Sequence, residues 1–191
     1  LHIYDPPSGK IQSFTHLDLP AGRAPLTQVN ELEIDRSGIV WMGTMQGLIK
    51  YQTRPSNFMV YNNRPGSVPE MSGRQILSIW PEDSLHIWLG IAGAGLNILD
   101  RQNKRVEKYH AHHVRPDRRI NNNMVYSIYK DGTGRIYLGT GDGINIMLPG
   151  EKRFRRFCQY FNDIPCPLFR DNTVYDIKAQ GSGILWMGSE N

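Results

Sequence analysis

Short runs of β-branched and aromatic residues follow one another along the chain, each bounded by turn-forming residues. In one unit, residues 28–34 (QVNELEI) and 39–44 (IVWMGT) are separated by the turn sequence DRSG, and residues 48–52 (LIKYQ) and 57–62 (NFMVYN) follow. This pattern predicts four short strands joined by turns. Because no segment sustains a helical apolar period with caps, the sequence predicts almost no helix.

The four-strand pattern recurs roughly every 48 residues, as columns of equivalent positions show. An aromatic residue stands on the second strand of each copy: Trp41, Trp88, Tyr137 and Trp186. A glycine follows it by two positions: Gly43, Gly90, Gly139 and Gly188. An acid or amide precedes it by six: Asp35, Glu82, Asp131 and Gln180. An aliphatic residue precedes it by nine: Leu32, Ile79, Ile128 and Ile177. Such a period indicates a propeller or solenoid array, and four strands per repeat favour propeller blades.

Incomplete copies stand at both ends of the chain. Residues 1–14 match residues 96–109, which predicts a third and a fourth strand, and residues 174–189 match a first and a second strand. A further fourth strand is expected at residues 154–159 (FRRFCQ). We therefore expect an all-β propeller of about four four-stranded antiparallel blades, with repeats at residues 1–27 (partial), 28–73, 74–122, 123–171 and 172–191 (partial). Two interpretations stay open: a closed four-bladed ring in which both termini share a blade, or a piece of a larger ring.

Composition and charge narrow the possible partners. The 191 residues include 39% hydrophobic and 21% charged residues, with a formal net charge of +4. No apolar run approaches the roughly 20 residues of a membrane helix, and the dense basic stripe of a nucleic-acid-binding protein is missing. The chain does not begin with Met, so we expect a processed or excised piece. Cys158 and Cys166 are compatible with a disulfide in an oxidising compartment or with two free thiols.

The consensus of the copies reads Asn-x-Val, Asp-x-x-Gly, Ile-Trp-x-Gly-Thr and Gly-Leu. One copy shows most of it at Asn123, Val125, Asp131, Gly134, Gly139, Thr140 and Gly143, and another at Asn172, Val174, Gly183, Trp186 and Gly188. This pattern resembles the two-component regulator propeller repeat along essentially the whole chain. The copy at residues 74–122 departs from it, because Leu85 replaces the turn glycine, Ile91 replaces the threonine, and the turn IAGAG is one residue longer. We expect a reshaped turn there.

The resemblance implies a function. Members of the family form the periplasmic sensor region of hybrid histidine kinases, notably in gut Bacteroidetes that degrade polysaccharides, and usually build seven-bladed rings. We therefore expect a non-catalytic, periplasmic sensor segment that binds an oligosaccharide or another small ligand, without a cofactor. Kinase activity and membrane contact would belong to parts of a full-length protein outside this segment. Self-association through neighbouring blades or as a homodimer is a further expectation.

The ligand is expected on the face that carries the long connections between blades, because binding residues concentrate on loops held by a rigid scaffold. The column before each first strand should lie near the ring axis: Thr27, Arg74, Asn123 and Asn172. These side chains suit sugar hydroxyls, and arginine adds a fork for carboxylate or sulfate; the alternative is that the asparagines cap local turns. A column on the first strands is expected to line a water-filled channel: Glu31, Ser78, Ser127 and Asp176.

The segment 110–119 (HAHHVRPDRR) is a second candidate. Arg115 and Arg118 suit an anion-binding patch for acidic sugars, with a solvated basic loop as the alternative. Consecutive loop histidines without an acidic or cysteine partner rarely converge on a metal, so no metal site is expected. The aromatic column is expected to pack between blades rather than to stack on sugars.

Two other functional classes compete with the sensor. A propeller lyase resembling streptogramin lyase would place histidine and acidic residues around the ring centre, whereas the central columns here contain no histidine. No nucleophile paired with a base can be argued from the sequence, which favours a binding protein over an enzyme. A protein-interaction scaffold, in which the loops hold a partner protein, is the third class.

Overall fold

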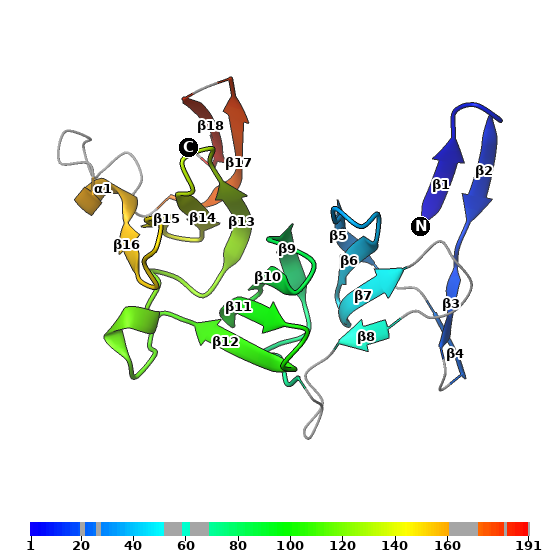
Figure 1. The fold of residues 1–191 in the computed structure, drawn as a ribbon, viewed down its shortest axis with the longest axis horizontal. Helices are drawn as coiled ribbons and strands as arrows, with labels where there is room; N and C mark the ends of the chain where they lie inside the picture. The colour runs from blue at the N-terminus through cyan, green and yellow to red at the C-terminus, as the bar shows by residue number, and fades with distance from the viewer. Residues whose placement is uncertain are drawn as a thin grey trace.

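The computed structural model describes residues 1–19, 22–25, 28–51, 59–61, 69–160, 172–181 and 183–190. In these ranges the chain forms three four-stranded antiparallel sheets, here called blades 1 to 3, and three two-stranded hairpins (Figure 1). Blade 1 contains β5 (Val29–Ile34), β6 (Val40–Thr44), β7 (Gly47–Tyr51) and β8 (Met59–Tyr61). Blade 2 contains β9 (Ile76–Pro81), β10 (His86–Ile91), β11 (Gly95–Asp100) and β12 (Arg105–Tyr109). Blade 3 contains β13 (Val125–Lys130), β14 (Ile136–Thr140), β15 (Gly143–Met147) and β16 (Phe154–Arg156).

The hairpins stand before and after the blades. The N-terminal hairpin pairs β1 (His2–Asp5) with β2 (Lys10–Ser13), and the C-terminal hairpin pairs β17 (Val174–Gln180) with β18 (Ile184–Ser189). A third hairpin pairs β3 (His16–Leu19) with β4 (Gly22–Pro25), where the sequence predicted a loop. The all-β prediction is confirmed, and the short helices of the described ranges are η1 (Pro116–Arg118) and α1 (Phe157–Tyr160).

The prediction of a fourth strand at residues 154–159 is confirmed for residues 154–156 and wrong for residues 157–159. Strand β16 ends at Arg156, and α1 begins at the next residue. The helical turn places Phe157, which is 7% exposed, against the ring of Tyr137 at a centroid distance of 6.2 Å. Burial of this ring against the neighbouring strands overrides the β-propensity of the segment.

The blades fan out from their first strands. Strand β5 contacts β9, β9 contacts β13, and β13 contacts β17, so these four strands lie innermost, and the strands that follow each of them extend outward (Figure 1). Apolar side chains of adjacent blades form separate buried clusters between them; the cluster between blades 1 and 2 contains Trp41, Ile79 and Leu89. Adjacent blades thus bury apolar side chains against each other, as blades of a propeller do.

The glycine column is required by the close approach of consecutive blades. A Cβ on Gly90 would lie 2.3 Å from the carbonyl oxygen of Val125 in blade 3, and one on Gly139 would lie 2.7 Å from the carbonyl oxygen of Val174. A Cβ on Gly43 would lie 2.7 Å from the side chain of Ile76. The equivalent Gly188 has nothing within 4 Å, because no strand covers it.

The aromatic column packs between blades, as expected, at three of its four positions. Trp41, Trp88 and Tyr137 are 0%, 4% and 3% exposed, whereas Trp186 in the C-terminal hairpin is 63% exposed. In all four copies the polar atom of the ring donates a hydrogen bond to the acid or amide six residues earlier. The distances are 2.9 Å for Trp41 to Asp35, 3.0 Å for Trp88 to Glu82, 3.0 Å for Tyr137 to Asp131 and 2.8 Å for Trp186 to Gln180. This bond explains why the acidic column accompanies the aromatic one.

The same carboxylate also caps the turn between the first two strands. Oδ1 of Asp35 accepts the backbone N–H groups of Ser37 and Ile39 at 2.8 and 3.1 Å. Blade 2 divides these two tasks: Glu82 accepts the indole N–H of Trp88, and Asp83 accepts the N–H groups of Leu85 and His86 at 2.6 and 2.7 Å. Asp83 thereby stabilises a turn that lacks the glycine of the other copies.

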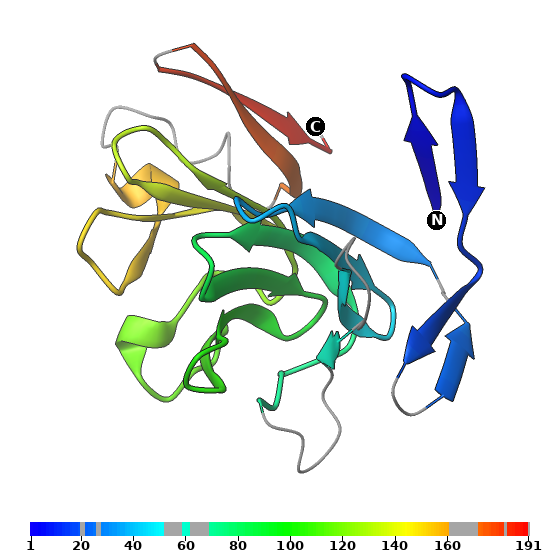
Figure 2. The same ribbon diagram turned by 45° about the vertical axis from the view of Figure 1, so that its right-hand side comes forward.

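The described chain is an open arc rather than a closed ring. The N-terminal and C-terminal hairpins belong to separate sheets and lie apart in both views (Figures 1 and 2). Leu1 packs against Met42 and Ile49 of blade 1, and the ring of Phe14 lies 6.0 Å from that of Tyr51. The N-terminal hairpin therefore occupies the place of the third and fourth strands of a preceding blade, as the sequence predicted.

Candidate functional site

The structure places five of the six predicted ligand residues, and these lie in two regions. Thr27 lies outside the described residues. Arg74, Asn123 and Asn172 precede the inner strands β9, β13 and β17, whereas Arg115 and Arg118 lie beyond the outer strand β12. Arg74 is exposed. The column near the axis and the basic loop are thus separate candidates.

The asparagines of the axial column connect blades. Oδ1 of Asn123 accepts the backbone N–H of Ala111, 12 residues earlier in the chain, at 2.7 Å. The backbone oxygen of Asn123 accepts the N–H of Gly95 at 2.9 Å, and that of Asn172 accepts the N–H of Gly143 at 2.8 Å. These two bonds tie the residues before β13 and β17 to the first residue of the third strand of the preceding blade.

The prediction that the polar column on the first strands lines a water-filled channel is wrong for Ser78 and Ser127. Ser78 and Ser127 are each 5% exposed, and Oγ of Ser78 donates to the backbone oxygen of Val125 in the next blade at 3.2 Å. The reason is a bulge near the start of every first strand, where the pairing register shifts. One extra residue at that point turns the following side chain toward the neighbouring blade.

The basic loop does form a concave surface. A cavity of about 410 Å³, here called the basic groove, runs along the outer strands of blade 2. It is lined by His86, Ile98, Asp100, Arg105, Val106, Glu107, Lys108, His113, Arg115 and Arg118. Arg115 and Arg118 are the predicted ligand residues that the structure brings together in one cavity.

Acidic neighbours hold both guanidinium groups. Arg115, whose side chain is 63% exposed, donates to the two carboxylate oxygens of Asp117 at 3.2 and 2.7 Å. The hydrogen bond from Arg115 keeps the pKa of Asp117 below its ordinary value. Arg118 is 15% exposed, pairs with Glu107, and lies over the ring of Tyr109 at 4.9 Å. Burial raises the pKa of Tyr109 to about 12, so its hydroxyl stays protonated and donates to Glu107 at 2.6 Å.

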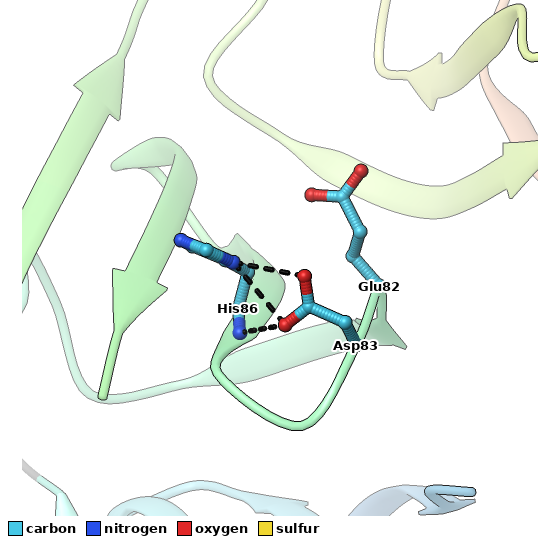
Figure 3. Close-up of side chains that lie close together, drawn as sticks. All are labelled: Glu82, Asp83 and His86. Atoms are coloured by element: carbon cyan, nitrogen blue, oxygen red, sulfur yellow. Dashed lines mark hydrogen bonds and ion pairs between the residues drawn. The ribbon is translucent and has the colours of Figure 1, made fainter. Parts of the chain in front are cut away.

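A histidine that the sequence analysis missed lies at one end of the groove. Nδ1 of His86 lies 3.0 Å from Oδ2 of Asp83 (Figure 3). This hydrogen bond raises the pKa of His86, and the same pairing helps to lower that of Asp83 against the effect of burial. Arg105 and Lys108 were missed as well, although the alternation RVEKY on an edge strand is a signal that places charged side chains at the surface.

Glu82, Asp83 and His86 also form a group whose ligand atoms lie within 4.8 Å of one another. Figure 3 shows the carboxylate of Glu82 directed away from the other two side chains. Glu82 accepts the indole N–H of Trp88 and pairs with Lys130 at 3.4 Å, and Asp83 caps the turn. These structural bonds account for the group without a metal ion.

One copy of the repeat matches a known family model. Residues 119–142, which span the end of the basic loop and the first two strands of blade 3, match the model described as "Two component regulator propeller". This segment of the chain is thus similar to a two-component regulator propeller repeat. The resemblance seen in the sequence is confirmed, and the asparagine, aspartate and glycine positions of that repeat are the ones that join and cap the blades.

Solved structures support the propeller fold around this repeat. The extracellular domain of a hybrid two component system from B. thetaiotaomicron matches 98% of the chain with a TM-score of 0.73 and 21% identity. The chain spans 23% of the length of that domain. The computationally designed Ika4 protein matches 86% of the chain, and 86% of its own length is covered, with a TM-score of 0.56 and 11% identity. None of the curated proteins matches the chain. Among the described residues, no helix is long and apolar enough to cross a membrane.

Proposed function

We propose that this two-component regulator propeller segment is a non-catalytic, extracytoplasmic sensor module that binds an anionic oligosaccharide. The observation that carries the proposal is the basic groove. Two arginines that the sequence singled out for acidic sugars line one cavity together with Arg105, Lys108 and His113. Its volume of about 410 Å³ falls within the range of small-ligand sites.

The geometry of the groove suits a carboxylate or sulfate group. Asp117 and Glu107 fix the two guanidinium planes, which reduces the conformational entropy that a ligand would have to remove. Arg115 keeps most of its side chain exposed, so a bidentate contact with an anionic sugar needs little rearrangement. Ile98 and Val106 supply the apolar surface against which a sugar ring packs.

A binding role fits the groove better than catalysis. The lining contains no serine, threonine or cysteine that could act as a nucleophile beside His86. His86 is itself paired with Asp83, which takes part in the turn. The lyase alternative would need a base directed at a substrate. Asp83, the partner of His86, instead holds the turn between β9 and β10.

A periplasmic location is part of the proposal. Cys158 in α1 is disulfide-bonded, and structural disulfides persist in oxidising compartments such as the periplasm. Cys166 lies outside the described residues. The similar solved domain from B. thetaiotaomicron is described as extracellular, which agrees with such a compartment.

Isothermal titration tests the proposal. The probes are oligosaccharides of equal length that are uronate-containing, sulfated or neutral. We expect binding of an anionic member without formation of product. Arg115→Gln should weaken that binding about tenfold, the loss of one charge-assisted contact. Arg36→Gln is the matched control, because it removes the same charge from an exposed turn of blade 1.

Three outcomes would overturn the proposal. Turnover of a bound sugar would indicate the lyase, and equal affinity for neutral and anionic sugars would remove the role of the arginines. If no oligosaccharide of the panel binds and a protein partner is captured through the loops, the scaffold would be favoured.

A further inference from the structure

We propose that the basic groove continues into a cavity between blades 2 and 3, here called the blade cleft, and that the blade cleft holds a neutral sugar unit next to the anionic unit in the groove. The inference rests on the proposed function, because it extends the same ligand into a second subsite. The blade cleft measures about 400 Å³, close to the size of the groove. His86, Ile98 and Glu107 line both cavities, so the two adjoin along blade 2.

The three shared residues lie on one face of blade 2. Trp88, two residues after His86 on β10, lies opposite Ile98 on β11, which in turn lies opposite Glu107 on β12. Glu107 marks the boundary between the cavities. Its carboxylate pairs with Arg118, which lines the groove, and accepts the hydroxyl of Tyr109, which lines the blade cleft, at 2.6 Å. Because both partners hold this carboxylate, the corner between the cavities is pre-organised for a ligand that turns around it.

Apolar side chains stand on both sides of the blade cleft. Ile136, Met147 and Pro149 line it from blade 3, and Trp88 and Ile98 line it from blade 2. Apolar walls with a few polar groups are typical of small-ligand sites. The C–H groups of a sugar ring can therefore pack against either wall, while its hydroxyl groups meet the polar side chains.

Glu151 supplies the observation that points to a ligand with hydroxyl groups. It lies in the turn between β15 and β16 and lines the blade cleft. Its Oε1 accepts a hydrogen bond from Arg155 at 2.7 Å, whereas its Oε2 is buried and has no hydrogen-bond partner among the described residues. A buried carboxylate oxygen without a donor is unfavourable. A sugar hydroxyl would supply the missing donor.

The charges of the blade cleft favour a neutral unit over a second anionic one. Three carboxylates line it, those of Glu82, Glu107 and Glu151. Two lysines line it as well, and one of them, Lys130, is paired with Glu82 at 3.4 Å. An anionic group would lie beside the carboxylates, and like charges brought together oppose binding. The groove, in contrast, contains the exposed guanidinium group of Arg115, so the anionic unit belongs there.

Isothermal titration with ligands of two lengths tests the second subsite. The short probes are glucuronic acid, galacturonic acid and sulfated galactose, and the long probes are the same sugars linked to one neutral hexose through each of the common linkages. We expect at least one long probe to bind about tenfold more tightly than its short counterpart, the gain from a hydrogen bond to a charged group. A panel in which no neutral unit improves binding would overturn the inference.

Glu151→Gln identifies the residue that receives the added unit. The variant keeps the size of the side chain but replaces one carboxylate oxygen with a nitrogen that donates. We expect it to lower the affinity for the long probe about tenfold and to leave the short probe unchanged, because a site built to accept a hydroxyl loses that contact. Glu70→Gln, which removes the same charge from an exposed position, is the control and should change neither affinity. Equal losses for both lengths in Glu151→Gln would contradict the subsite.

The same titrations separate this inference from the proposed function. Arg115→Gln should weaken the short and the long probe alike, since both place their anionic unit in the groove. If the short probe binds and depends on Arg115 while the neutral unit adds nothing, the blade cleft is not a subsite and the groove remains the binding site. If no anionic probe of either length binds, the proposed function fails, and this inference fails with it.

Discussion

Replacement of Gly90 by alanine is the sharpest test of how the blades pack. The added Cβ would lie 2.2 Å from Oγ of Ser78 and 2.3 Å from the backbone oxygen of Val125. The serine could rotate, but the carbonyl belongs to β13 of the next blade and moves only with that strand. The φ angle of Gly90 is not in the left-handed region, so the cost would be steric rather than conformational.

The expected magnitude follows from the closeness of the contact. Overpacking a well-packed interface costs about 1 to 3 kcal/mol, and a backbone oxygen so near places Gly90→Ala toward the upper figure, about 3 kcal/mol. In a chain of this size each kcal/mol lowers the melting temperature by about 2 to 4 °C. We therefore expect a decrease of about 6 to 12 °C by calorimetry, and a lower urea midpoint with an unchanged slope.

Two control variants separate packing from a general effect of alanine. Gly132→Ala adds a Cβ with nothing within 4 Å and should change the free energy of unfolding by less than about 0.5 kcal/mol. Gly188 belongs to the same column as Gly90, but a Cβ added there also has nothing within 4 Å, so Gly188→Ala is a second control. If Gly90→Ala is as stable as Gly132→Ala, the close packing of β10 on β13 is wrong.

Three further outcomes follow from the side-chain contacts. Because the hydrogen bond with Asp83 raises the pKa of His86, the stabilisation is full below the unfolded pKa of about 6.5 and disappears as the pH rises through the higher folded value. The urea midpoint of His86→Gln should thus fall below that of the wild type more at pH 5.5 than at pH 8.5, and an equal deficit would contradict this. Asn145→Leu should cost more by calorimetry than Asn97→Leu, since both ends of the Asn145 amide are bonded whereas Nδ2 of Asn97 is buried without a partner; the reverse order would refute it. Cys158→Ser should lose about 2 to 4 kcal/mol, and a reductant should destabilise the wild type but not this variant.

The repeated columns made most of the fold predictable. Trp41 and Gly43 have counterparts at a fixed spacing because each blade packs on the next in the same way. One assigned strand pair therefore predicts the equivalent pairs of the other blades. Asp35 recurs for a reason that its spacing alone does not give: it caps the turn and also accepts the indole N–H of Trp41.

The candidate site was less predictable, because its geometry depends on interruptions of the pattern. The polar character of the first-strand column placed Ser78 in a channel, but the bulge beside it turns this side chain toward the next blade. For the amide of Asn123 the sequence offered a sugar contact or a local turn cap, whereas its bond to Ala111, 12 residues earlier, could not be read from the sequence. Arg115 and Arg118 were found because their loop departs in composition from every other connection.

The position of the basic groove follows from the way in which blade 2 departs from its neighbours. The residues that the repeats share, such as the buried glycines and aromatics, pack the blades together or cap their turns. These positions are therefore not exposed to a ligand. Blade 2 lacks the turn glycine, and Asp83 takes over the turn, which leaves His86 where the other copies have Ile39, Arg135 and Ile184. That histidine forms one end of the groove, and the arginines of the following loop form the other. A chain built from near-identical units thus obtains a distinct surface where one unit deviates and compensates, and in this protein the deviation lies under the groove proposed to bind the ligand.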